Sequence, residues 1–122
     1  NYAINFKKKD KKLLMGNTSI FRDWGWTPDY IEAIYKIINA KVKKDYVVGT
    51  GKISSLNELI KKIFKIFNIN MRLMVKNEKK LLRSREIKKI GCKIDNIKND
   101  LKWEPRISVD QMIKKLIKNE LY

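Results

Sequence analysis

The order of strand and helix signals between residues 46 and 75 is the feature that most limits what this chain can fold into. Residues 46–51 are β-branched and end in glycine, as a buried strand does. Residues 56–67 repeat apolar side chains at helical spacing, with lysines on the opposite face. Residues 71–75 stand where a return strand would follow. This order predicts an α/β unit.

Capping signals place three helices along the chain. Ser55 and Glu58 form a capping box at the start of the second. Ahead of the first, Thr27 is predicted as the N-cap, with Pro28 at the first helical position. The third is predicted to be capped by Ser108 and Gln111. Each helix has an apolar stripe that needs a partner surface. In chain order, the stripes are Tyr30, Ile31, Ile34, Ile37 and Ile38; Leu56, Leu59, Ile60, Ile63, Phe64 and Phe67; and Val109, Met112, Ile113, Leu116 and Ile117.

Several shorter segments suggest a chain that is part of something larger. Residues 12–15 are a weak strand candidate, and Asp95 is predicted to cap a short helix that ends near Trp103. Residues 2–6 resemble the last turn of a helix that starts earlier. Two or three short strands make a poor sheet. We therefore expect residues 1–122 to be a single substrate-binding domain at one edge of a larger sheet, the C-terminal part of a longer protein.

The absence of histidine removes most familiar catalytic and metal sites. With no histidine and only Cys92, neither a Ser-His-Asp nor a Cys-His arrangement can be built, and a zinc site is not expected. No apolar run approaches the roughly 20 residues that span a bilayer. The first residues lack the features of a signal peptide. A cytoplasmic protein is therefore expected, and membrane partners are not.

The net charge of +16 favours anionic partners. Lysines nevertheless occur in nearly every segment instead of one patch, and lysine, isoleucine and asparagine are abundant together. A biased coding composition explains this pattern better than nucleic-acid binding does. A basic nucleic-acid-binding module remains as an alternative prediction.

Residues 20–30, Ile-Phe-Arg-Asp-Trp-Gly-Trp-Thr-Pro-Asp-Tyr, hold two of the three tryptophans and one of the few arginines. We predict a loop over residues 21–26, in which Asp23 orients the Arg22 guanidinium. The planar fork of arginine suits a phosphate, which it can bind through two hydrogen bonds. The alternative is that Arg22 and Asp23 only stabilise the loop. Trp24 and Trp26 are expected to pack against the protein.

The order of these motifs resembles the GDP-mannose 4,6-dehydratase family, within the extended short-chain dehydrogenases/reductases. The matching segments, in a consistent order, are Gly16-Asn17, Arg22-Asp23-Trp24-Gly25-Trp26, residues 29–33, residues 46–51, residues 82–87 and Leu101-Lys102-Trp103-Glu104-Pro105. Departures from the family pattern include Ser84, Arg85, and Lys102 in place of a glycine.

The resemblance implies a fold, a reaction and a set of binding residues. The fold would be the C-terminal substrate-binding part and edge strands of a Rossmann-like NAD(P)-binding enzyme. That enzyme converts GDP-mannose to GDP-4-keto-6-deoxy-mannose and water, with NADP and the catalytic residues on an N-terminal Rossmann portion. No catalytic residue, cofactor or metal is expected on this chain alone. Arg22 and Arg83 would clamp the diphosphate, Glu86 would accept a hydrogen bond from a ribose hydroxyl, and Asn17 would line the same pocket.

The same resemblance leaves other outcomes open. The full enzyme is expected to be a homo-oligomer, and the chain alone is expected to be inactive. A sibling nucleotide-sugar epimerase, dehydratase or reductase is the nearest alternative. A nonfunctional remnant is a further one.

Overall fold

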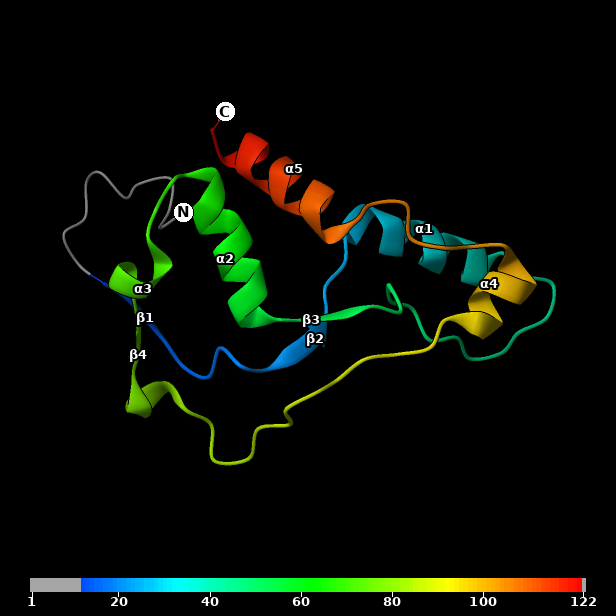
Figure 1. The fold of residues 1–122 in the computed structure, drawn as a ribbon. Coiled ribbons are helices and arrows are strands. Elements are labelled where there is room, and N and C mark those ends of the chain that lie inside the picture. Colours follow the sequence, from blue (N-terminus) through cyan, green and yellow to red (C-terminus); the bar gives the residue numbers. More distant parts are fainter. Residues whose placement is uncertain (1–11, 122) are drawn as a thin grey trace.

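The computed structural model describes residues 12–121, which form short strands and longer helices (Figure 1). The predicted helical turn at residues 2–6 lies outside the described residues. In chain order the elements are β1 (Leu13–Met15), β2 (Phe21–Asp23), α1 (Thr27–Ile38), β3 (Ile53–Ser55), α2 (Leu56–Ile66), α3 (Met71–Met74), β4 (Val75–Asn77), the 3₁₀ helix η2 (Lys79–Leu81), α4 (Asp95–Leu101) and α5 (Val109–Leu121).

The two predicted capping boxes are confirmed. Ser55 N donates to Glu58 Oε2 at 2.8 Å, and Glu58 N donates to Ser55 Oγ at 3.1 Å, at the start of α2. At the start of α5, Ser108 N donates to Gln111 Oε1 at 2.8 Å, and Gln111 N donates to Ser108 Oγ at 3.3 Å. Each box satisfies amides that have no partner inside the helix.

The two other predicted caps are wrong, although their helices form. Trp26 is the N-cap of α1 and makes no side-chain capping bond, so Thr27 is already helical. Ile94 is the N-cap of α4, and Asp95 is the first helical residue. Neither sequence carries the acidic or amide partner three residues later that locks the box in α2 and α5.

Helix α1 packs with only part of its predicted apolar stripe. Ala33, which is fully buried, lies with Tyr30 and Ile37 against the buried Trp103 and Ile97. The three remaining residues of the stripe are exposed: Ile31 by 59%, Ile34 by 47% and Ile38 by 65%. Within the described residues, only part of the predicted stripe is therefore covered.

The strands form two small sheets. β1 pairs in parallel with β4, with Leu13 opposite Val75, and β2 pairs antiparallel with β3, with Phe21 opposite Ser55. Residues 21–23 are therefore a strand and not the predicted loop.

Two predicted strands are wrong or shifted. Residues 46–51 pair with no strand among residues 12–121, and the chain bends at Gly49 and at Gly51, whose φ is +71°; β3 forms after them instead. Val47 is 55% exposed between half-buried neighbours, so the segment has the side-chain alternation of a strand without a ladder. Residues 71–74 form α3, because the Asn70 side chain accepts from Arg72 N and starts a helical turn; the strand begins at Val75.

Two apolar clusters stand on either side of the β2–β3 sheet (Figure 1). One holds Trp103 and Ile97 against α1 and the extended residues 46–48. The other holds Ile60 and Phe64 of α2 against β1, β4 and α3. The β2–β3 sheet thus links the two clusters, and any site built on β2 depends on both.

We expect the substitution Lys102→Gly to stabilise the chain. Lys102 ends α4 in the left-handed conformation, with φ at +50°, where a Cβ atom clashes with the following carbonyl. Removing that Cβ should raise the free energy of unfolding by about 0.5–1 kcal/mol, after the extra chain entropy of glycine is offset. Urea unfolding followed by circular dichroism measures the change.

Asn68→Gly is the matched control. Asn68 also has a positive φ, of +53°, but asparagine tolerates that region better than lysine. Its gain should be smaller. A Lys102→Gly chain less stable than the parent would contradict the strain at this position.

Candidate functional site

Two stretches far apart in the sequence meet at the edge of β2 and just before it. A Cβ added to Gly16 would lie 2.6 Å from the Leu81 carbonyl oxygen, so the two backbones are in close contact there. Further along, Phe21 N donates to Lys88 O at 2.8 Å, in a parallel arrangement. The two stretches therefore meet near both of their ends and run in the same direction at Phe21.

These stretches, residues 16–22 and 81–90, are called the paired segments below. They carry all four residues predicted to bind the nucleotide. The first segment carries Asn17 and Arg22, and the second carries Arg83 and Glu86.

The surroundings of the four residues differ. Half-buried Asn17 closes the turn after β1, where its Oδ1 accepts from Ser19 N at 2.9 Å. Arg22 is half-buried on β2, and its Nη1 donates to the Phe21 carbonyl at 2.7 Å. Arg83 is exposed and Glu86 is half-buried. The cationic groups thus stand on two adjoining strips of backbone.

The prediction that Asp23 orients Arg22 is wrong, since no hydrogen bond or ion pair joins these two described residues. Successive side chains of a strand point to opposite faces, which separates the two groups. The Asp23 carboxylate instead accepts hydrogen bonds from Thr50 N at 2.9 Å, Thr50 Oγ1 at 2.6 Å and Gly51 N at 2.8 Å. It also accepts from Cys92 Sγ at 3.3 Å.

Asp23, Thr50, Gly51 and Cys92 together form what we call the Asp23 node. Gly49 makes room for it, because a Cβ there would lie 2.2 Å from Cys92 Sγ and 3.0 Å from Asp23 Oδ2. Burial, and next the hydrogen bond to Asp23, raise the pKa of the Cys92 thiol, so it stays protonated as a donor. The sequence signal for the node is the glycine-rich turn at residues 49–51. Strand composition alone interprets this turn as the end of a strand.

The tryptophans of residues 20–30 are half-buried at the sheet and not in the clusters. Trp24 Nε1 donates to Ser54 O at 2.9 Å, across the β2–β3 pair. The Trp26 ring lies 5.8 Å from Lys115 Nζ. The fully buried tryptophan is Trp103, whose Nε1 donates to Asp29 O at 3.1 Å.

Asp29 makes a second carboxylate cross-link, far along the chain from its partners. It is 8% exposed, and its Oδ2 accepts from Arg106 N and Ile107 N, both at 3.0 Å. This cross-link holds the connection between α4 and α5 against α1.

A cavity of about 460 Å³ opens beside the first paired segment. Its size is within the range of small-ligand sites. It is polar and carries two cationic side chains from α2 and α3. Its polar lining residues are Thr18, Ser19, Asn57, Lys61, Arg72 and Asn77. Sequence reasoning missed them because they come from the β1–β2 connection, α2, α3 and β4, with no common spacing.

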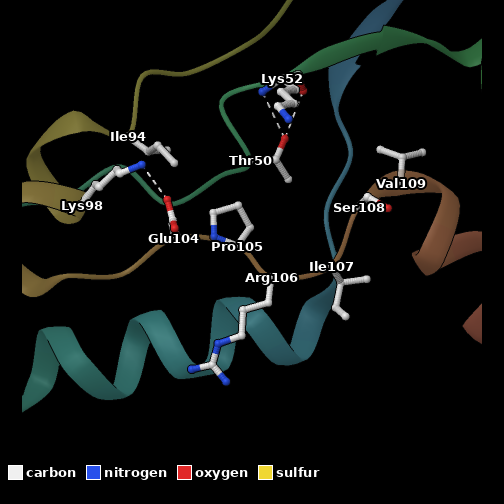
Figure 2. A pocket seen from close by; sticks show the side chains of 10 residues that line it. All are labelled: Thr50, Lys52, Ile94, Lys98, Glu104, Pro105, Arg106, Ile107, Ser108 and Val109. Atoms are coloured by element: carbon white, nitrogen blue, oxygen red, sulfur yellow. Dashed lines mark hydrogen bonds and ion pairs between the residues drawn. The ribbon is translucent and has the colours of Figure 1, made fainter.

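A second cavity, of about 450 Å³, lies on the Thr50 side of the Asp23 node (Figure 2). Its lining mixes the apolar Ile94 and Pro105 with the ion pair between Lys98 and Glu104, whose atoms are 2.6 Å apart. None of the four predicted nucleotide-binding residues lines either of these two cavities.

Metal and membrane sites can be assessed over residues 12–121 only. In that range no group of three or more acidic, cysteine or histidine side chains could hold a metal ion. Over the same residues, no helix has the length and apolar character needed to cross a bilayer.

Comparison with known proteins turns the resemblance into membership. The family model for GDP-mannose 4,6 dehydratase matches residues 1–116. The chain belongs to the GDP-mannose 4,6-dehydratase family. GDP-mannose 4,6 dehydratase 1 from Arabidopsis thaliana is 27% identical over 110 residues, 90% of this chain. The human GDP-mannose 4,6 dehydratase is 26% identical over 120 residues, 84% of this chain.

Solved structures place the fold of this family member. The chain superposes on RMD from Pseudomonas aeruginosa, complexed with NADPH, with a TM-score of 0.83 at 17% identity, over 96% of this chain and 39% of that one. It superposes on UDP-glucose 4-epimerase from Thermotoga maritima, bound to UDP-glucose, with a TM-score of 0.77 at 18% identity, over 99% of this chain and 39% of that one. The predicted fold class, part of an NAD(P)-binding extended short-chain dehydrogenase/reductase, is confirmed.

The match covers only part of the length of the relatives. The match covers 30% of the Arabidopsis protein and 32% of the human protein. The chain therefore spans about a third of the length of these curated dehydratases.

We expect Tyr30, which lies beside the Asp23 node, to ionise late. Burial, and next the charge of Asp23, raise its pKa to about 12. An unfolded tyrosine ionises near pH 10. Between these values the unfolded state binds fewer protons than the folded state, so stability falls as pH rises.

Absorbance titration of tyrosinate measures this directly. The parent chain should show a phenol that titrates near pH 12 and is missing from Tyr30→Phe. The unfolding midpoint of Tyr30→Phe should also fall less steeply than that of the parent over the same range. A Tyr30 signal that titrates near pH 10 in the folded chain would contradict the burial argument.

Proposed function

We propose that this chain provides the nucleotide-sugar-binding part of a GDP-mannose 4,6-dehydratase. The reaction would convert GDP-mannose to GDP-4-keto-6-deoxy-mannose and water, with NADP held by an N-terminal Rossmann portion. The observation that carries the proposal is that the paired segments meet near both of their ends. Arg22 adjoins one of these contacts, and Arg83 and Glu86 lie in the second segment between its two contacts.

The two arginines suit a diphosphate. A guanidinium is permanently charged and can form two parallel hydrogen bonds to phosphate oxygens, which a lysine cannot do. In this proposal Arg22 and Arg83 bind the diphosphate from the two paired segments. Glu86 accepts a hydrogen bond from a ribose hydroxyl, and Asn17 lines the same pocket.

The cavity beside Thr18 and Ser19 supports an anionic ligand at this place. Lys61 and Arg72 on its wall add positive charge next to the first paired segment. Charge of one sign around a cleft raises the local concentration of an oppositely charged ligand.

The chemistry of the reaction is assigned to the Rossmann portion. The chain has no histidine, and we assign it no catalytic residue. The exposed Ile31, Ile34 and Ile38 of α1, together with the extended residues 46–48, give a surface that such a portion would cover. An apolar helix face and an unpaired strand both favour association with a partner layer.

The first expectation concerns nucleotide affinity. Loss of a charge-assisted hydrogen bond costs about 1.5–3 kcal/mol, so Arg22→Gln and Arg83→Gln should each weaken GDP-mannose binding by roughly tenfold or more. Isothermal titration calorimetry on the full chain measures the dissociation constants.

Arg85→Gln is the matched control. Arg85 lies two residues from Arg83 on the same exposed stretch. Its loss should change affinity little. If Arg85→Gln weakens binding as much as Arg83→Gln does, general charge and not a specific clamp explains the binding.

A second expectation concerns activity. The chain alone should not turn over GDP-mannose, and a chain fused to the Rossmann portion of a relative should do so in the presence of NADP. Mass spectrometry detects the product by its loss of water. Turnover of a different nucleotide sugar, with none of GDP-mannose, would move the assignment to a sibling epimerase, dehydratase or reductase.

A further inference from the structure

We propose that Asp23 is the positioning residue of the nucleotide site. Its carboxylate holds β2 and the end of the second paired segment in a fixed relation, so that Arg22 and the residues at 83–86 meet the same ligand. This inference rests on the proposed function. What it adds is that the hydrogen bonds of Asp23 hold the two paired segments in place relative to each other.

Asp23 joins three separate parts of the chain. It lies on β2 and accepts hydrogen bonds from the loop at Thr50 and Gly51. It also accepts from Cys92, which lies two residues after the end of the second paired segment. That segment is thus held near its start by the contact at Gly16, near its end by Phe21, and beyond its end by Asp23.

Because Asp23 and Arg22 are neighbours on β2, the hydrogen bonds of Asp23 also fix the direction in which Arg22 points. Neighbouring side chains of a strand point to opposite faces, so Asp23 fixes β2 from the face that Arg22 leaves free. β2 is also hydrogen-bonded on both edges, to β3 on one and to residues 88–90 on the other. A shift of β2 would therefore move Arg22 relative to Arg83 and Glu86.

The node requires a carboxylate. It receives donors from Thr50 N, Thr50 Oγ1, Gly51 N and Cys92 Sγ, and a carboxylate is a pure acceptor with room for about four. Asparagine would replace one oxygen with an NH₂ group facing those donors. The substitution Asp23→Asn thus breaks the link with little change in side-chain volume.

Asp29 offers a matched control within the same chain. It too is an aspartate that accepts two backbone amides from a distant segment, those of Arg106 and Ile107. Those partners belong to the connection before α5, outside the paired segments. Asp29→Asn therefore removes similar bonds without touching the proposed link.

Hydrogen exchange tests the link without any ligand. In the full chain, Asp23→Asn should speed exchange at the Phe21 and Ile90 amides at least tenfold, because both donate across the paired segments. Asp29→Asn should leave these amides as in the parent and speed exchange at Arg106 and Ile107. Parent-like protection of Phe21 and Ile90 in Asp23→Asn would overturn the proposal.

Binding of GDP and GDP-mannose tests the consequence for the site. At a temperature where circular dichroism shows parent-like helix content, Asp23→Asn should bind at least tenfold more weakly, and Asp29→Asn within about threefold of the parent. Equal losses in the two variants would overturn the positioning role. A parent chain that binds neither ligand, while the exchange pattern holds, would overturn the nucleotide site and not the link.

A second pair of variants covers the case in which Asp23→Asn does not fold. Thr50→Val removes the hydroxyl that donates to Asp23 at 2.6 Å and keeps the side-chain shape. It should weaken binding of GDP by about threefold and speed exchange at Phe21. Thr50→Ser keeps the hydroxyl and should restore both values to those of the parent; failure of that rescue would count against the link.

Discussion

The hydrogen bonds of one carboxylate, that of Asp23, are the constraint on which the central part of this structure depends. The β2–β3 sheet has only two short strands, and an isolated two-stranded sheet is marginal in water. Asp23 supplements it with bonds to the Thr50–Gly51 loop and to Cys92. Charge-assisted bonds of this kind are stronger than those between neutral groups. Three stretches that share no element are held together as a result.

The two apolar clusters explain why the site lies where it does. Trp103 and Ile97 organise one side of the molecule, and Ile60 and Phe64 organise the other, with β2 and β3 between them (Figure 1). The paired segments run along this junction. The uncovered residues of α1 face away from the cluster they flank. The chain belongs to a family whose curated members are about three times the length of the matched region. The rest of such a protein could supply the surface that covers these residues of α1.

Local signals predicted helices α1, α2, α4 and α5, although the caps assigned to Thr27 and Asp95 were wrong. The capping boxes at Ser55 and Ser108 formed as predicted, because each needs only a partner three residues later. The signals failed where a distant partner decides. Residues 46–51 have strand composition, but a strand needs a neighbour, and none of the described residues pairs with them. Asp23 was assigned to Arg22 because they adjoin in sequence, although a strand turns them apart.

The sequence by itself determined the helices α1, α2, α4 and α5, the α/β class, the family and the four residues proposed to bind a nucleotide. Only the tertiary structure decided that Gly16 meets Leu81 and Phe21 meets Lys88, and that Asp23 bonds to Thr50, Gly51 and Cys92. The physical reason is range. Helix periodicity and capping arise from neighbours within one turn, whereas a hydrogen bond between residues 23 and 92 depends on how the whole chain packs.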